Sequence, residues 1–246
     1  MPTPTLTEEM IKRYGPNPNK WNKWNWVYIS QFQGLSEDLI REFKDKVYWS
    51  RISCNQKLSE NFIREFQDDV DWAYISQSQV LSEDFIREFK NRVHWSFISY
   101  KQKFSEDFIR EFKYEVNWYY ISNHQKLSEN FIREFKDNVN WMNISAWQTL
   151  SENFIREFQD KVHWDFISLH QKLSENFIKE FKDKINMEYF VKHNKSCPPD
   201  IRIRYMIDNN MIKKQDPNTH MIEYGTKENI IKEDNSLQQL KDLIKD

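Results

Sequence analysis

The sequence predicts an all-α protein, an α-solenoid of about eight two-helix repeats of 23 residues with a divergent C-terminal cap. Trp recurs every 23 residues seven times, from Trp26 to Trp164, and Ser recurs at the same spacing from Ser36 to Ser174. The repeated unit reads L-S-E-[DN]-F-I-R-E-F-x-x-x-V-x-W-x-x-I-S-x-x-Q-x. A period kept over seven copies indicates a repeat architecture. Only 3 Gly and 7 Pro occur among 246 residues, too few turn formers for an all-β fold.

The first half of each unit predicts a short amphipathic helix. In the second copy Ser59 is a suitable N-cap, and Glu60 in the first turn suits the positive end of the helix dipole. Apolar side chains follow at i, i+1, i+4 and i+8, the spacing of one helix face. This stripe consists of Phe62, Ile63, Phe66 and Val70.

The second half predicts another helix, running from Trp to about the residue after Gln. The repeated residues of the third copy lie within an arc of about 100° and are expected to face the stack: Trp72, Ile75, Ser76 and Gln79. The Ser would allow close approach, and the Gln would satisfy a polar group between repeats. Asx before Trp, as at Asp71, is a good cap, whereas Tyr48, His94 and His163 should cap less well. Helices this short are marginal alone, so they must stack.

The two ends differ from the repeat. Residues 1–34 are predicted to form an N-terminal capping repeat with an insertion at 15–20, residues 35–190 the tandem repeats, and residues 191–246 a divergent cap or tail. Pro198-Pro199 is expected to stop the last repeat helix. Residues 200–205 resemble a worn ninth unit, and residues 228–246 could form a helix that covers the last apolar edge.

The motif LSEDFIREF followed by W-x-x-IS-x-x-Q resembles a short tandem repeat of proteins from large DNA viruses that infect amoebae. The resemblance covers roughly residues 6–190 and rests on several residues at fixed offsets. It implies a multi-copy α-helical repeat protein, and it supplies no catalytic residues.

Several classes of function are disfavoured. No GxGxxG, GKS/GKT, HExxH or GxSxG motif occurs, and the six His are scattered, so we expect no enzyme, no cofactor and no metal site. The first ten residues lack the pattern of a signal peptide, and no apolar run could span a membrane. Two Cys in unrelated positions favour a reducing compartment. We expect a cytoplasmic monomer, in a host cell if the protein is viral.

Candidate binding residues come from positions that change between copies. Four positions of each second helix, at +1, +2, +5 and +6 from Trp, vary and share the side opposite the repeated stripe. The predicted partner-binding residues on this variable face are Tyr28, Phe32, Arg51, Tyr74, Phe97, Tyr100, Tyr120, His124, Trp147, Phe166 and His170. Such residue types anchor protein interfaces, so we expect an unidentified protein partner.

Other interpretations stay open. The variable positions could have drifted, although Glu is invariant at 42, 65, 88, 111, 134, 157 and 180, which drift explains only if ion pairs between repeats fix it. The aromatic series could be partly buried between second helices. A nucleic-acid-binding repeat protein is an alternative, because Arg recurs from Arg41 to Arg156. Neighbouring Glu and a net charge of −2 disfavour nucleic acid. A structural, virion-associated protein is the third possibility.

Overall fold

The computed structural model describes residues 14–15, 17–31 and 34–209, and within these ranges it is helical and contains no strand. The chain divides into two compact bodies, Met1–Gln125 and Lys126–Asp246, here called the N-terminal and C-terminal bodies. Each body is a series of helix pairs that recur every 23 residues. The predicted α-solenoid of about eight repeats is therefore confirmed.

Each repeat consists of a first and a second helix. The first helices are α3 (Glu37–Glu42), α5 (Glu60–Glu65), α7 (Glu83–Glu88), α9 (Glu106–Glu111), α11 (Glu129–Glu134), α13 (Glu152–Glu157) and α15 (Glu175–Glu180). The second helices are α2 (Lys23–Gln31), α4 (Trp49–Asn55), α6 (Trp72–Ser78), α8 (Trp95–Lys101), α10 (Trp118–His124), α12 (Trp141–Trp147), α14 (Trp164–His170) and α16 (Met187–His193). A 3-10 turn, η1 (Pro18–Lys20), precedes α2, and α17 (Pro199–Asp208) follows α16.

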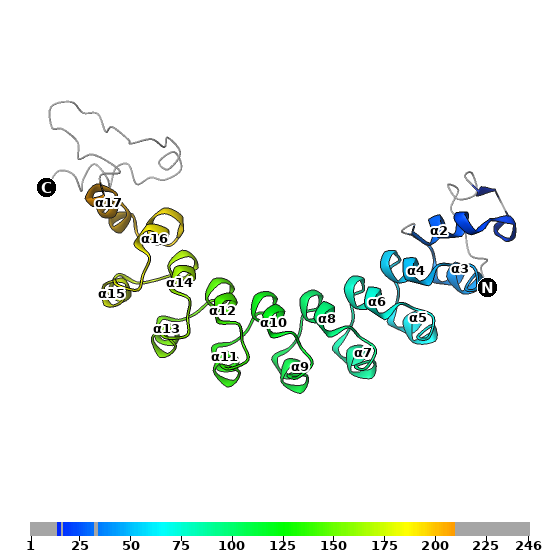
Figure 1. Cartoon of the computed structure of the whole chain (residues 1–246), viewed down its shortest axis with the longest axis horizontal. Helices are drawn as coiled ribbons and strands as arrows, with labels where there is room; N and C mark the ends of the chain where they lie inside the picture. Colours follow the sequence, from blue (N-terminus) through cyan, green and yellow to red (C-terminus); the bar gives the residue numbers. More distant parts are fainter. Residues whose placement is uncertain (1–13, 16, 32–33, 210–246) are drawn as a thin grey trace, which may run out of the picture. The chain divides into compact units, whose positions relative to one another are not determined.

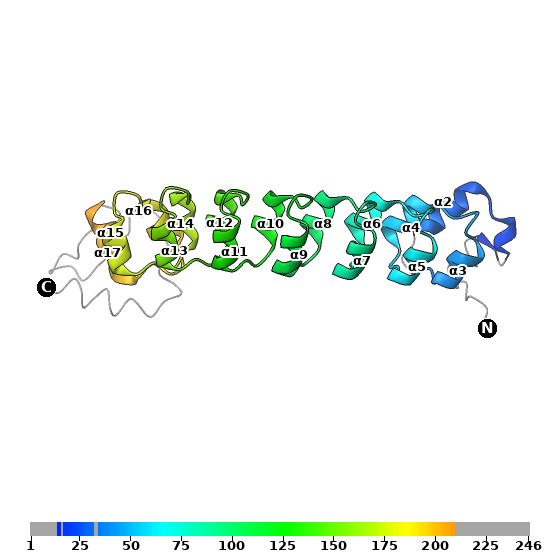
Figure 2. The same ribbon diagram turned by 90° about the horizontal axis from the view of Figure 1, so that it is seen from below.

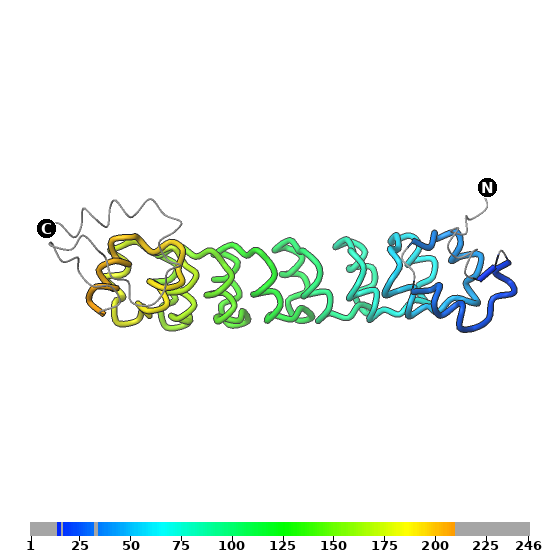
Figure 3. Tube along the Cα trace, turned by 90° about the horizontal axis from the view of Figure 1, so that it is seen from above, coloured from blue at the N-terminus to red at the C-terminus, as the bar shows by residue number. Residues whose placement is uncertain are grey.

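Within each body the helices form two rows (Figure 1). In the N-terminal body α4, α6, α8 and α10 form one row, and α5, α7 and α9 lie in the other; in the C-terminal body α12, α14 and α16 stand opposite α11, α13 and α15. Consecutive second helices of a body pack against each other. The helices of a row lie side by side and run across it (Figures 2 and 3). One side of each body is thus built from second helices alone.

The first helices are shorter than the apolar pattern predicts. The Oγ of Ser59 accepts a hydrogen bond from Phe62 N at 3.2 Å, as expected of an N-cap. The helix ends at Glu65, however, and Phe66 is its C-cap. Val70 follows in a series of turns, where its N–H donates to Phe66 O at 3.0 Å. Both side chains are buried, so the apolar stripe marks the core correctly but continues beyond the helix.

The second helices also end earlier than predicted. Gln79 is not helical but is the extended C-cap of α6, because its side chain is used between repeats. Asp71 accepts from the N–H groups of Ala73 and Tyr74, at 3.0 and 3.3 Å. The side chains of Tyr48, His94 and His163 make no capping bond, as predicted. At the first copy α2 begins at Lys23, three residues ahead of Trp26.

The Trp residues join successive repeats while remaining half-buried, except Trp26, which is buried. The ring of Trp72 lies 4.8 Å from that of Phe89 in the next repeat, between ring centroids. Its Nε1 donates to the carbonyl of Gln67 at 2.9 Å. The expectation that these rings are fully enclosed is wrong, because the Nε1 edge lies beside a turn at the surface. Their packing between repeats is as predicted.

The last repeat is more complete than its sequence indicates. Helix α16 spans the boundary drawn at residue 190 and ends at His193, ahead of the prolines. Pro199 does not stop a repeat helix; it occupies the first turn of α17, where a missing N–H costs nothing. Helix α17 packs on α16 and buries Ile203. The predicted helix over 228–246 and most of the N-terminal cap lie outside the described residues.

Candidate functional site

The invariant Gln connects each repeat to the preceding one. The buried Nε2 of Gln79 donates to Ser53 O at 3.0 Å and to Gln56 O at 2.8 Å. Its Oε1 accepts from Leu58 N at 3.1 Å. In α16 Asn194 occupies the Gln position, and its Nδ2 donates to Ser168 O and Gln171 O, each at 2.8 Å. The predicted polar role of Gln between repeats is therefore confirmed, and all three partners are backbone atoms.

Ser and Glu of the motif also bond to the adjacent repeat. The Oγ of Ser53 accepts from Asp71 N at 2.9 Å, and the same bond recurs from Ser30, Ser76, Ser99, Ser145 and Ser168. At the start of the first helix, Glu60 Oε1 accepts from Ser82 N at 2.6 Å. These side chains are fixed by stacking, since each satisfies a backbone N–H of the following copy.

The Arg and Glu ladders pair with one another. Arg64 Nε lies 2.7 Å from an Oε atom of Glu88 in the next first helix. Its guanidinium lies 5.0 Å above the centroid of the Phe85 ring. Arg87 repeats this geometry with Glu111 at 2.7 Å, and its donated hydrogen bond raises the pKa of the Arg87 guanidinium above its ordinary value. The invariance of Glu thus has a structural cause, and the drift interpretation of the variable face survives on this point.

The Arg–Glu pairs should contribute only modestly to stability. Replacing Glu65, which lies 2.8 Å from Arg41 Nε, with Gln should lower the free energy of unfolding by about 0.2–1 kcal/mol, because the pair is partly exposed. The loss should shrink in 1 M NaCl, which screens the attraction. Urea denaturation at low and high salt measures both effects. Glu115→Gln removes an exposed carboxylate outside these pairs and should change neither value; equal losses for the two variants would contradict the pairing.

Large apolar side chains are exposed almost entirely on the second helices. Those on second helices are Trp24, Tyr28, Tyr74, Tyr100, Tyr119, Met142, Trp147 and Tyr189. Val80 and Tyr114 are exposed in the connections between helices. Among the described residues, no first helix exposes a large apolar side chain. The second-helix side of each body therefore carries aromatic surface that the stack does not cover.

In the N-terminal body the aromatic residues gather on α8 and α10. The ring of Tyr100, which is 54% exposed, lies 5.5 Å from Tyr120 and 4.8 Å from His124, between centroids. Tyr119 extends the group and lies 5.5 Å from Tyr120. The structure brings together three predicted residues here. The prediction missed Tyr119, although its position after Trp is one of the four that vary.

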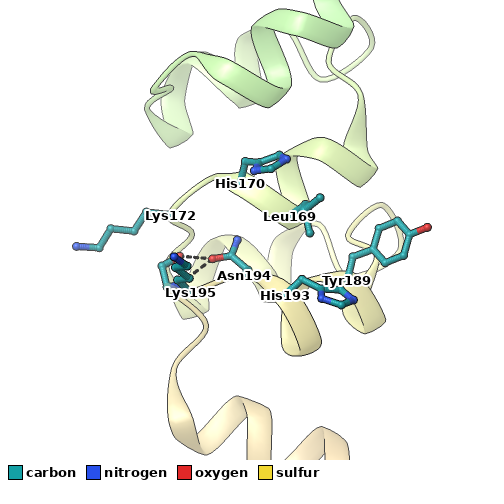
Figure 4. Close-up of a pocket in the computed structure, with 8 residues that line it drawn as sticks. Leu169, His170, Lys172, Tyr189, His193, Asn194 and Lys195 are labelled. Carbon is teal, nitrogen blue, oxygen red and sulfur yellow. Dashed lines mark hydrogen bonds between the residues drawn. The ribbon is translucent and has the colours of Figure 1, made fainter. Parts of the chain in front are cut away.

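In the C-terminal body the aromatic groups lie on α12, α14 and α16. Trp147, 61% exposed, stacks on His170 with 5.9 Å between centroids, and Phe166 stacks on the same imidazole at 6.1 Å. Beside them is a hollow of about 650 Å³ between α14 and α16 (Figure 4). Its lining consists of Leu169, His170, Lys172, Tyr189, His193, Asn194, Lys195 and Ser196. Of these residues, only His170 was predicted.

The remaining predicted residues are distributed along the bodies. Exposed on their helices are Tyr28, Arg51, Tyr74, Tyr100, Trp147 and His170. Half-buried are Phe97, Tyr120, His124 and Phe166, so the aromatic series is covered only in part. Phe32 lies outside the described residues. Two variable positions of α12 are not exposed: Asn143 and Ala146 are buried. The variable face is therefore interrupted there.

Groups for catalysis or metal binding do not converge in the described part of the chain. No group of His, Cys, Asp and Glu there could hold a metal ion. Cys54 is half-buried, and burial raises the pKa of the Cys197 thiol, which disfavours its reactive thiolate. None of the helices described is long and apolar enough to cross a bilayer. Comparisons with protein-family models, curated proteins and solved structures found no match to this chain.

Proposed function

We propose that this protein is a non-enzymatic repeat scaffold that binds a protein partner through the variable face of its second helices. One observation carries the proposal: large apolar side chains are exposed on second helices and not on first helices within the described ranges. Stacking alone would bury such residues, and a clustered apolar surface is typical of an interaction site. Tyr and Trp are also the residue types that contribute most to protein interfaces.

The repeat supports this division between stacking and binding. The invariant Gln, Ser, Arg and Glu side chains are used in bonds between copies, as Gln79, Ser53 and Arg64 illustrate. The positions that differ between copies make none of these recurring bonds. A scaffold of this kind can present a different side chain from each repeat without changing how the repeats pack.

Nucleic acid is the less favoured partner. The Arg ladder is paired with Glu and does not offer phosphate a continuous basic track. Base stacking requires a free ring face, whereas Tyr100 meets Tyr120 and His124 edge to face, at 66° and 90°. These rings are held against each other in a geometry better suited to side chains of a protein.

A peptide selection tests the proposal. Peptides enriched from a library of random twelve-residue sequences against the full chain should lose about tenfold or more in affinity for a Tyr100→Ala/Tyr120→Ala variant, because that variant removes an aromatic anchor. Tyr114→Ala removes a ring that is 85% exposed after a first helix and is the matched control. Equal affinity for all three proteins, or equal loss in both variants, would contradict binding at the second helices.

A further inference from the structure

Charge is distributed unequally between the two halves of the repeat. The seven segments that run from the start of a second helix to the loop before the next Ser position, from 49–58 to 187–196, contain eight Lys or Arg and two Asp or Glu. The seven segments between them, from 36–48 to 174–186, contain sixteen Lys or Arg and twenty-five Asp or Glu. The side that carries the exposed aromatic groups is therefore also the cationic side.

The two acidic residues of the cationic segments already have partners. Asp165 accepts from Asn186 Nδ2 at 3.0 Å, and Glu188 accepts from Lys192 Nζ at 2.6 Å. Neither carboxylate lines the hollow between α14 and α16. Positive charge on that lining is thus not balanced by an acid within the lining itself.

The hollow combines cationic and apolar groups. Lys172 and Lys195 are exposed and belong to none of the ion pairs among the described residues. Leu169 and His170 come from α14, and Tyr189 and His193 come from α16 (Figure 4). A volume of about 650 Å³ accommodates a few side chains. The lining offers ammonium and imidazole groups for an anion beside an apolar surface.

We propose that this hollow binds a short acidic segment of the protein partner, with Lys172 and Lys195 contacting its carboxylates and Leu169 and Tyr189 packing on its methylene groups. Charge complementarity selects this occupant, because ammonium–carboxylate hydrogen bonds are among the stronger polar contacts. Two lysines at one hollow fit a few carboxylates better than the regular phosphates of a nucleic acid strand. This inference rests on the proposed function and specifies its partner chemistry.

Fluorescence anisotropy on the full chain tests the proposal with a labelled Glu-Glu-Leu-Glu-Glu peptide. A Lys172→Gln/Lys195→Gln variant should bind the peptide at least about fivefold more weakly, and so should the wild type the peptide with Gln for Glu. Lys179→Gln/Lys182→Gln makes the same charge change around α15 and should leave affinity within about twofold. The ring protons of His170 and His193 should shift on titration with the acidic peptide.

Three outcomes would overturn the proposal: equal binding of the Gln peptide, tighter binding of a ten-nucleotide oligothymidine through the same lysines, or no binding of the acidic peptide at millimolar concentration. If library peptides still depend on Tyr100 and Tyr120 in that case, the scaffold function stands and only the acidic chemistry fails. If they do not, both proposals fail.

Discussion

Replacing Phe85 with alanine should lower the free energy of unfolding by about 3–5 kcal/mol. The ring is fully buried and lies 4.7 Å from Phe89 in its own repeat and 6.2 Å from Trp72 in the preceding one, between centroids. Arg64 covers it from that same preceding repeat at 5.0 Å. Its removal therefore opens a cavity where two copies meet, which neighbouring groups can refill only in part.

Urea denaturation of the full chain, followed by circular dichroism, measures this loss. Tyr114→Ala deletes an aromatic ring that lies in solvent, so we expect a change within about 0.5 kcal/mol. A loss below about 1 kcal/mol for Phe85→Ala would show that the contact between repeats does not depend on this ring.

Replacing Gln79 with methionine should cost roughly 2–4 kcal/mol, because it keeps the length of the side chain and removes its hydrogen bonds. Two buried carbonyls, of Ser53 and Gln56, lose a donor, and the amide of Leu58 loses its acceptor. Hydrogen exchange at Leu58 N–H should accelerate in this variant. The measurement locates the damage in the preceding repeat, where a general loss of helix would not be confined.

The control lies two residues away on the same segment. Gln77 is exposed, so Gln77→Met makes the same chemical change where water replaces any lost hydrogen bond. We expect the exchange rate of Leu58 and the urea midpoint to stay as in the wild type. Matching effects in Gln77→Met and Gln79→Met would contradict a specific bond between repeats.

Much of the fold could be predicted because the same local signals recur in register. Ser59 was expected to cap a helix and does, and Ile63 and Val70 were expected in the core and are buried. The helix ends could not be predicted this way. Phe66 stays in the core after the helix has ended, so apolar spacing does not mark the end. Gln79 leaves the helix for backbone partners that only the stacked repeats supply.

The site was predictable in composition and less so in arrangement. Variation between copies correctly indicated an aromatic face that includes Tyr100 and Trp147. It could not show that invariant Glu88 pairs with Arg64, since these residues are 24 positions apart and meet only across stacked helices. Tyr189 and His193 were missed because Met187 in place of Trp suggested that the pattern had ended. The Asn at 194 stands 23 residues after Gln171 and was the signal that it had not.

The bonds of Gln79 have a wider consequence, because all three reach main-chain atoms that every amino acid possesses. Recognition between neighbouring copies is therefore generic with respect to the residues that differ among them. An array built on such bonds can gain, lose or reorder whole copies in frame and still stack correctly. Its binding repertoire can then change by recombination of intact modules as readily as by point substitution.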